Sequence, residues 1–184
     1  LLSALPVYSL KTLEVDLAQN PGLSAAAIGR LTNLQQLTLS CRPCSCFPPG
    51  VIERLSSLTK LTQLDLGNTA FPPEGNAKLP QQLQMLAINF GVKETDLYID
   101  LEYLTDLHQL QLGLGRQPVG KAALPLHLRQ LSIRIESLSG HLISALAACD
   151  IASLTQLTEL QLDRSDDTME SLQSLAGHPQ LQSL

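Results

Sequence analysis

The chain has 184 residues with a net charge of −5, and 44 % of its residues are hydrophobic, so it can bury the core of one domain. The excess of acids disfavours nucleic acid as the main partner. An aromatic content of 3 % without Trp disfavours base-stacking platforms and aromatic cages. Leucine is the unusual component of the chain, with 41 residues.

The sequence carries no targeting signal that we can identify. The N-terminal segment is apolar but lacks a basic leading region, so a signal peptide is not predicted. The longest apolar stretch, residues 142–154, is interrupted by Asp150 and is too short to span a bilayer. We therefore expect a cytoplasmic protein that does not contact a membrane; a cytoskeletal, axonemal or nuclear location stays open.

One spacing recurs along the chain: Leu-x-x-Leu-x-Leu, with Ile or Val allowed at the last position. Seven complete copies follow one another at a mean interval of about 24 residues, and an eighth is cut off by the end of the sequence. The copies begin at Leu10, Leu34, Leu61, Leu83, Leu107, Leu128, Leu157 and Leu181. This regularity predicts that residues 1–184 form a single array of about 7.5 repeats, which we expect to be a fragment of a longer chain.

Each copy predicts a short strand with one buried face, because alternate side chains of a strand point the same way. A single strand of this size cannot bury its apolar face alone, so successive copies are expected to stack as parallel strands around a common core. Parallel neighbours need a return connection of about a dozen residues, which the repeat interval leaves after each strand.

The return segments are predicted from their apolar spacing and their turn residues. Spacings of three and four predict helices with one buried stripe, at residues 25–30, 51–58, 97–104, 142–154 and 169–176. The two shortest intervals predict Gly- and Pro-rich turns, at residues 76–80 and 115–124. Most strands are preceded by Leu-Thr-x-Leu or Leu-Pro, which places an extra apolar residue one step ahead of the strand.

The seven blocks resemble those of the leucine-rich repeat family, over nearly the whole chain. Residues 166–181 are similar to the intracellular, ribonuclease-inhibitor-like or F-box-associated type of repeat. The resemblance implies an α/β repeat solenoid, a curved horseshoe with a parallel concave sheet and short helices or loops on the convex side. The family motif continues with Asn or Cys three residues after its third Leu. Here that slot is mostly filled by other residues, although a shifted reading of the first strand places Asn20 in it.

If the strands stack, the residues between the leucines form three exposed columns along the array. The candidate binding face consists of the polar and large members of these columns. They are Glu14, Asp16, Gln36, Thr38, Gln63, Asp65, Met85, Asn89, Gln109, Gln111, Gln130, Arg134, Glu159, Gln161 and Asp163. The remaining column positions hold Thr12, Ser40, Gly67, Ala87, Gly113 and Ser132. Five acids and one base make the face mildly acidic, so it is either a solvated surface or a weak, charge-steered site for a basic partner.

No catalytic, cofactor or metal site is predicted. Cys41, Cys44 and Cys46 have metal-like local spacing, but zinc needs four ligands and the remaining Cys149 is about four repeats away. Free loop thiols are the favoured interpretation, and a redox or metal role is left open. No Ser, Cys or acid has the local setting of an activated nucleophile.

These observations predict a non-catalytic protein–protein interaction module or scaffold that uses its concave face to bind another protein. The resemblance carries this prediction, because fold alone does not determine function. Nucleic acid, membranes and small-molecule substrates are not expected as partners. Two alternatives stay open: the substrate-recognition part of an F-box-type ubiquitin-ligase adaptor, and a regulatory array fused to an enzyme domain outside this sequence.

Overall fold

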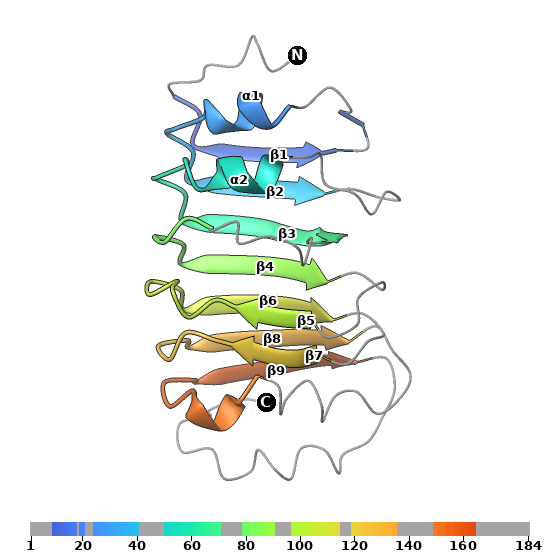
Figure 1. Ribbon diagram of the computed structural model, residues 1–184, viewed down its shortest axis with the longest axis vertical. Helices are drawn as coiled ribbons and strands as arrows, with labels where there is room; N and C mark the ends of the chain where they lie inside the picture. The colour runs from blue at the N-terminus through green and yellow to red at the C-terminus, as the bar shows by residue number, and fades with distance from the viewer. Residues whose placement is uncertain are drawn as a thin grey trace.

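The computed structural model describes residues 9–17, 19–20, 24–40, 50–70, 79–90, 97–114, 119–135 and 149–164. Seven strands form one parallel sheet in the order β1-β2-β3-β4-β6-β8-β9, and they are stacked along the long axis of the molecule (Figure 1). Their bounds are Thr12–Asp16 (β1), Gln36–Ser40 (β2), Gln63–Ala70 (β3), Met85–Phe90 (β4), Gln109–Leu114 (β6), Gln130–Ile135 (β8) and Glu159–Arg164 (β9). Each strand begins inside one of the seven complete motifs, as predicted. The eighth motif lies outside the described residues.

We call each strand of the seven-stranded sheet, together with the return segment that precedes it, a coil, and we number the coils 1 to 7 in sheet order. Strands β1 to β4 therefore belong to coils 1 to 4, β6 to coil 5, β8 to coil 6 and β9 to coil 7. Positions within a coil are counted from the first leucine of its motif, which is position 0. Thus Leu61 is position 0 of coil 3 and Leu64 is position +3. This numbering allows equivalent residues of different coils to be compared directly.

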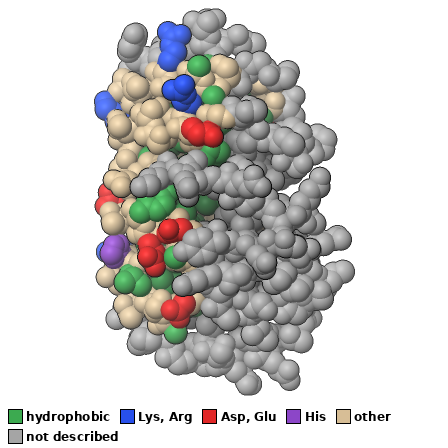
Figure 2. Space-filling model, in the orientation of Figure 1, with side chains coloured by type: hydrophobic (Ala, Val, Ile, Leu, Met, Phe, Trp, Pro, Cys, Tyr) green, Lys and Arg blue, Asp and Glu red, His purple; other side chains and the backbone are tan. Residues whose placement is uncertain are grey.

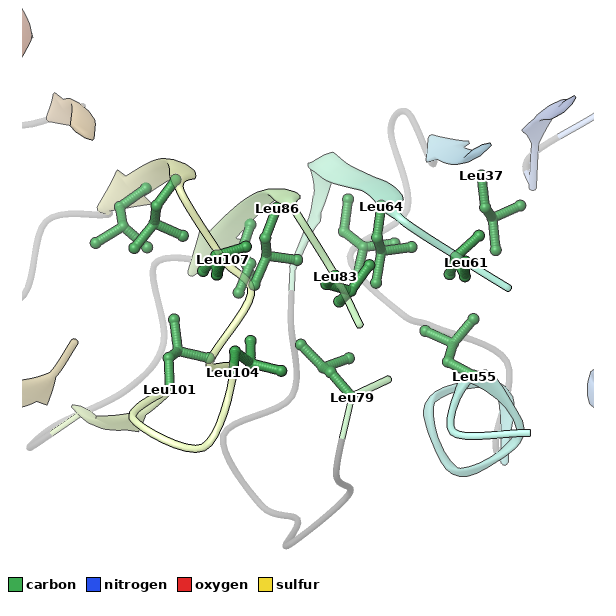
Figure 3. Packing of buried hydrophobic residues seen from close by; sticks show 14 of the residues in the cluster. Leu37, Leu55, Leu61, Leu64, Leu79, Leu83, Leu86, Leu101, Leu104 and Leu107 are labelled. Carbon is green, nitrogen blue, oxygen red and sulfur yellow. The ribbon is translucent and has the colours of Figure 1, made fainter. Parts of the chain in front are cut away.

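The core consists of apolar layers that run along the whole stack. Positions 0, +3 and +5 are buried under the sheet, as the motif predicts, except that Leu10, Leu13 and Leu162 in the two end coils are only partly buried. The predicted extra apolar residue is also buried: it is the leucine at position −3 in coils 2, 3, 5 and 7 and the leucine at position −4 in coils 4 and 6, where Pro follows it. A further buried layer at position −6 lies on the side away from the sheet. It is formed by Ile28, Leu55, Leu101, Ala122 and Ile151. Figure 3 shows Leu55 and Leu101 of this layer below the leucines that lie against the strands.

The return segments of coils 2 and 3 are helical, as predicted. Helix α1 spans Ala25–Gly29 and begins at Ser24, whose Oγ accepts a hydrogen bond of 3.3 Å from the backbone N–H of Ala27. Helix α2 spans Val51–Leu55, which is shorter than expected. It ends at Ser56 and Ser57, whose hydroxyl groups donate hydrogen bonds to backbone carbonyls of the helix. Such side-chain hydrogen bonds compete with the backbone hydrogen bonds that would continue the helix.

Two predictions for the return segments are wrong, because each segment contains a strand where a helix or a turn was expected. Residues 97–104 hold strand β5 (Leu97–Asp100) followed by a turn, and residues 115–124 hold strand β7 (Val119–Ala123). The two strands pair in parallel as a small second sheet, which lies in front of β6 and β8 in Figure 1. Hydrogen bonding between neighbouring returns favours an extended chain where apolar segments are too short to form stable helices.

The remaining predicted elements are only partly within the described residues. The C-terminal part of the 142–154 helix contains a single turn of 3-10 helix at Ile151–Ser153. The 169–176 helix and most of the 76–80 turn lie outside the described residues. Asn20 is described, and its Nδ2 donates a hydrogen bond of 2.9 Å to the backbone carbonyl of Asp16, so it satisfies the backbone where β1 ends.

Candidate functional site

The candidate binding face is the surface of the seven-stranded sheet that points away from the core. Strand pairing is in register through the first two columns, so positions +2 and +4 each form an unbroken row across seven coils. For example, Gln36 pairs with Gln63, and Gln109 pairs with Gln130. The predicted residues of these two columns therefore lie on one continuous face, which we call the concave face.

The third column departs from the prediction at coil 3. Ser40 pairs with Asn68 and Asn89 pairs with Ala70, so Gly67 is not in the column. The registers shift within β3, which is longer than its neighbours, and such irregularities end the regular pairing of a strand locally. From coil 4 onward the column is regular again, with Asn89 beside Gly113 and Arg134 beside Asp163.

Side chains of neighbouring coils bond to one another at the C-terminal end of the concave face. Gln130 Nε2 donates to Glu159 Oε2 at 2.9 Å, and Arg134 Nε donates to Asp163 Oδ2 at 2.9 Å. The Arg134 and Asp163 side chains are 65 % and 51 % exposed, so water screens this ion pair. Both acids of coil 7 are thus engaged by donors of coil 6, which reduces the negative potential at this end.

The acidic character of the face is concentrated at the other end. Glu14 and Asp16 belong to coil 1 and Asp65 to coil 3, and the columns of coils 1 to 3 contain no Lys or Arg. Glu14 is exposed, whereas Asp16 and Asp65 are partly covered by their neighbours. Like charges on one surface add to a common potential, so this half of the face is the one that attracts cationic groups.

The centre of the concave face is flatter and less charged than its ends. Ala87 at position +4 of coil 4 is only 3 % exposed, and Met85 beside it is partly buried. Asn89 extends over Gly113, where an added Cβ would lie 2.8 Å from the Asn89 Cγ and Oδ1 atoms. Asn89 Oδ1 is buried and accepts no hydrogen bond from the part of the chain that the structure describes. The sequence pattern listed Asn89 as a face residue but gave no sign of this close packing.

The described residues provide little reactive chemistry. Burial raises the pKa of the Cys149 thiol to about 12, so this side chain is protonated at neutral pH and is a poor nucleophile. Burial also raises the pKa of Tyr103, whose hydroxyl accepts a hydrogen bond of 2.9 Å from the Leu79 backbone N–H. Within the described ranges, no three His, Cys, Asp or Glu side chains come together to hold a metal ion. Cys41, Cys44 and Cys46 lie outside those ranges.

The parallel sheet, the stacked leucine layers and the outer returns define a leucine-rich repeat solenoid with an α/β architecture. No protein-family profile matches the chain, and no curated protein matches it. Among solved structures, the chain is similar to an internalin from Listeria monocytogenes, with 22 % identity and a TM-score of 0.44. The match covers 97 % of this chain and 61 % of the internalin chain. In the part of the chain that is described, no helix is long and apolar enough to cross a membrane.

Proposed function

We propose that this array is a non-catalytic protein-binding module and that the concave face is its binding surface. The observation that carries the proposal is the unbroken face of seven in-register strands, on which polar and acidic side chains stand in rows. Such a face offers many side chains on a rigid support, which suits recognition of a large partner.

The charge of the face selects the kind of partner. Glu14, Asp16 and Asp65 give the columns of coils 1 to 3 an acidic composition, so the partner is expected to carry Lys or Arg where it meets these coils. The face lacks the Trp, Tyr and clustered Arg residues that dominate tight interfaces. Binding is therefore expected to be modest in affinity and sensitive to salt.

A matched pair of charge-reversal variants tests the proposal. The first variant reverses the concave face with Glu14→Lys, Asp65→Lys and Glu159→Lys. The control variant makes the same change in net charge on the outer side with Glu53→Lys, Glu102→Lys and Asp150→Lys. All six side chains are exposed or partly exposed, so both proteins are expected to fold.

Binding is measured to arrays of Lys- and Arg-rich peptides, with Ser-substituted peptides of the same length as the reference. The proposal predicts that the concave variant binds the basic peptides at least about tenfold more weakly than the control variant. Equal losses in both variants would show attraction by net charge alone and would contradict a binding site on the concave face. Unchanged binding in the concave variant would contradict it as well.

A further inference from the structure

Charges on the outer side of the array are separated along its length. Among the described residues of coils 1 to 3, the exposed charged side chains outside the columns are Lys11, Arg30, Glu53, Arg54 and Lys60. Among the side chains of coils 5 to 7 whose burial the structure describes, they are Asp100, Glu102, Asp106, Arg129 and Asp150. Figure 2 shows the result: blue side chains gather in the upper part of this side, and most red side chains lie in the lower part. Among these described side chains, one half is therefore basic and the other acidic.

The opposite charges occupy equivalent positions of their coils. Arg54 and Asp100 are both at position −7, each directly before a buried leucine of the −6 layer, namely Leu55 and Leu101. Figure 3 shows these two leucines on the same side of the core. The burial of Leu55 and Leu101 fixes the backbone of both segments at the same depth. Arg54 and Asp100 therefore start from corresponding points of coils 3 and 5.

A second pair repeats this relation at the edge where the chain enters the strands. Lys60 and Asp106 are both at position −1, directly before Leu61 and Leu107, which are buried at position 0. The Lys60 ammonium donates to the Asn33 Oδ1 atom, which is neutral, so its charge is not compensated there. Coil 3 is basic and coil 5 is acidic at the same two positions, with coil 4 midway between them.

These charges do not neutralise one another within a single chain. Coils 3 and 5 are separated by two strand spacings, about 10 Å, which is close to the screening length at physiological salt. Within the described part of the chain, none of the four side chains forms an ion pair. No described residue therefore neutralises the four charged groups.

We propose that this outer side binds a second copy of the chain in antiparallel orientation. The two-fold axis runs along the strand direction at the level of coil 4. This operation reverses the order of the coils and keeps the position within each coil, so coil 3 of one copy faces coil 5 of the other. Arg54 then faces Asp100 and Lys60 faces Asp106, and the symmetry produces each pair twice. No two like-charged residues fall on matching positions among the described side chains.

The surface used here is separate from the concave face, so the dimer leaves the proposed protein-binding site accessible. Its contacts are exposed ion pairs, which are individually weak and strongly screened. The association is therefore expected to be reversible and to weaken as salt is added.

Two variants of identical composition test the register of the charges. Arg54→Glu with Asp100→Lys exchanges the charges of one facing pair, so attraction is kept. Arg54→Glu with Asp106→Lys also reverses one base and one acid, but it places like charges opposite each other. The new glutamate then faces Asp100, and the new lysine faces Lys60. Sedimentation equilibrium at about 20 mM salt measures the dimer dissociation constant of each variant and of the natural chain. The concave variant Glu14→Lys with Asp65→Lys is the control for the protein-binding face.

The proposal predicts that the matched variant dimerises like the natural chain. The mismatched variant is expected to dimerise at least about tenfold more weakly, and the concave control is expected to be unaffected. Equal constants for the matched and mismatched variants would overturn it. A natural chain that remains monomeric at low salt and millimolar concentration would overturn it too. Neither result would bear on the concave face, whose test uses peptide binding.

Discussion

Leu64 provides the most direct test of how this fold is stabilised. It lies at position +3 of coil 3 with 0 % of its surface exposed, and it belongs to the continuous core. In Figure 3 it lies with Leu61 and Leu83, which come from its own coil and the next. Leu64→Ala removes contacts with more than one coil and leaves a cavity that the rigid stack cannot close. We expect it to lower the free energy of unfolding by about 2–5 kcal/mol.

Leu126 is the matched control, because it is the same residue type in the same array but is 58 % exposed. Leu126→Ala is expected to change stability by about 0.5 kcal/mol or less. Urea unfolding followed by circular dichroism measures both variants. With a slope of about 2 kcal/mol per molar urea, a loss of about 3 kcal/mol lowers the midpoint by about 1.5 M. Equal midpoint shifts for the two variants would refute the assignment of Leu64 to a packed core.

Three further predictions concern other features of the structure. With the other cysteines replaced by serine, Cys149 is expected to react with a disulfide reagent at least about 100-fold faster in urea than in the native protein. Because its pKa rises from 9.0 to about 12 on folding, stability is expected to fall as the pH rises from 9.0 towards 12, and a rise would contradict this. Gly113→Ala places a Cβ 2.8 Å from Asn89 atoms and is expected to cost about 1–3 kcal/mol, a cost that Asn89→Ala should largely relieve in the double variant. A double-mutant cycle on Arg134 and Asp163 is expected to give about 1 kcal/mol or less, vanishing at about 1 M salt; a larger, salt-independent coupling would contradict screening of this pair.

The repeat was predictable from sequence because its signal is local and repeated. Each Leu-x-x-Leu-x-Leu block specifies which side chains share a face, and seven copies at similar intervals leave stacking as the way to bury them. The same logic assigned the first two columns, since a fixed position in each coil maps to a fixed row of the sheet. The extra apolar residue at position −3 or −4 also follows from local patterns, namely Leu-Thr-x-Leu and Leu-Pro.

The conformation of the returns was harder to predict, because short apolar segments fit both a helix and a strand. Residues Leu97–Asp100 carry a spacing that suits a helix, yet they form β5 because β7 of the next coil offers a parallel partner. That partner is a long-range feature which no local window contains. The displacement of Gly67 has a similar origin, since it depends on how β3 pairs with both neighbours.

The charge relation between coils 3 and 5 was also hidden from the repeat pattern. The residues involved lie in the returns, which differ in conformation, so Arg54 in a helix and Asp100 in a strand do not look equivalent in the sequence. Counting back from each motif gives both the same position, and the shared burial of the following leucine shows that they lie at corresponding points of their coils. Structure was needed to align segments that the motif does not cover.

Distances between coils test most directly whether the strands form one in-register face. Spin labels at Gln36 and Gln130 are four strand spacings apart in the first column, and labels at Gln36 and Glu159 are five apart. We predict separations of about 19 Å and about 24 Å by pulsed electron paramagnetic resonance, in step with a strand spacing of about 4.8 Å. Distances that do not increase with coil number, or that scatter broadly for both pairs, would contradict the stacked array and the binding face built on it.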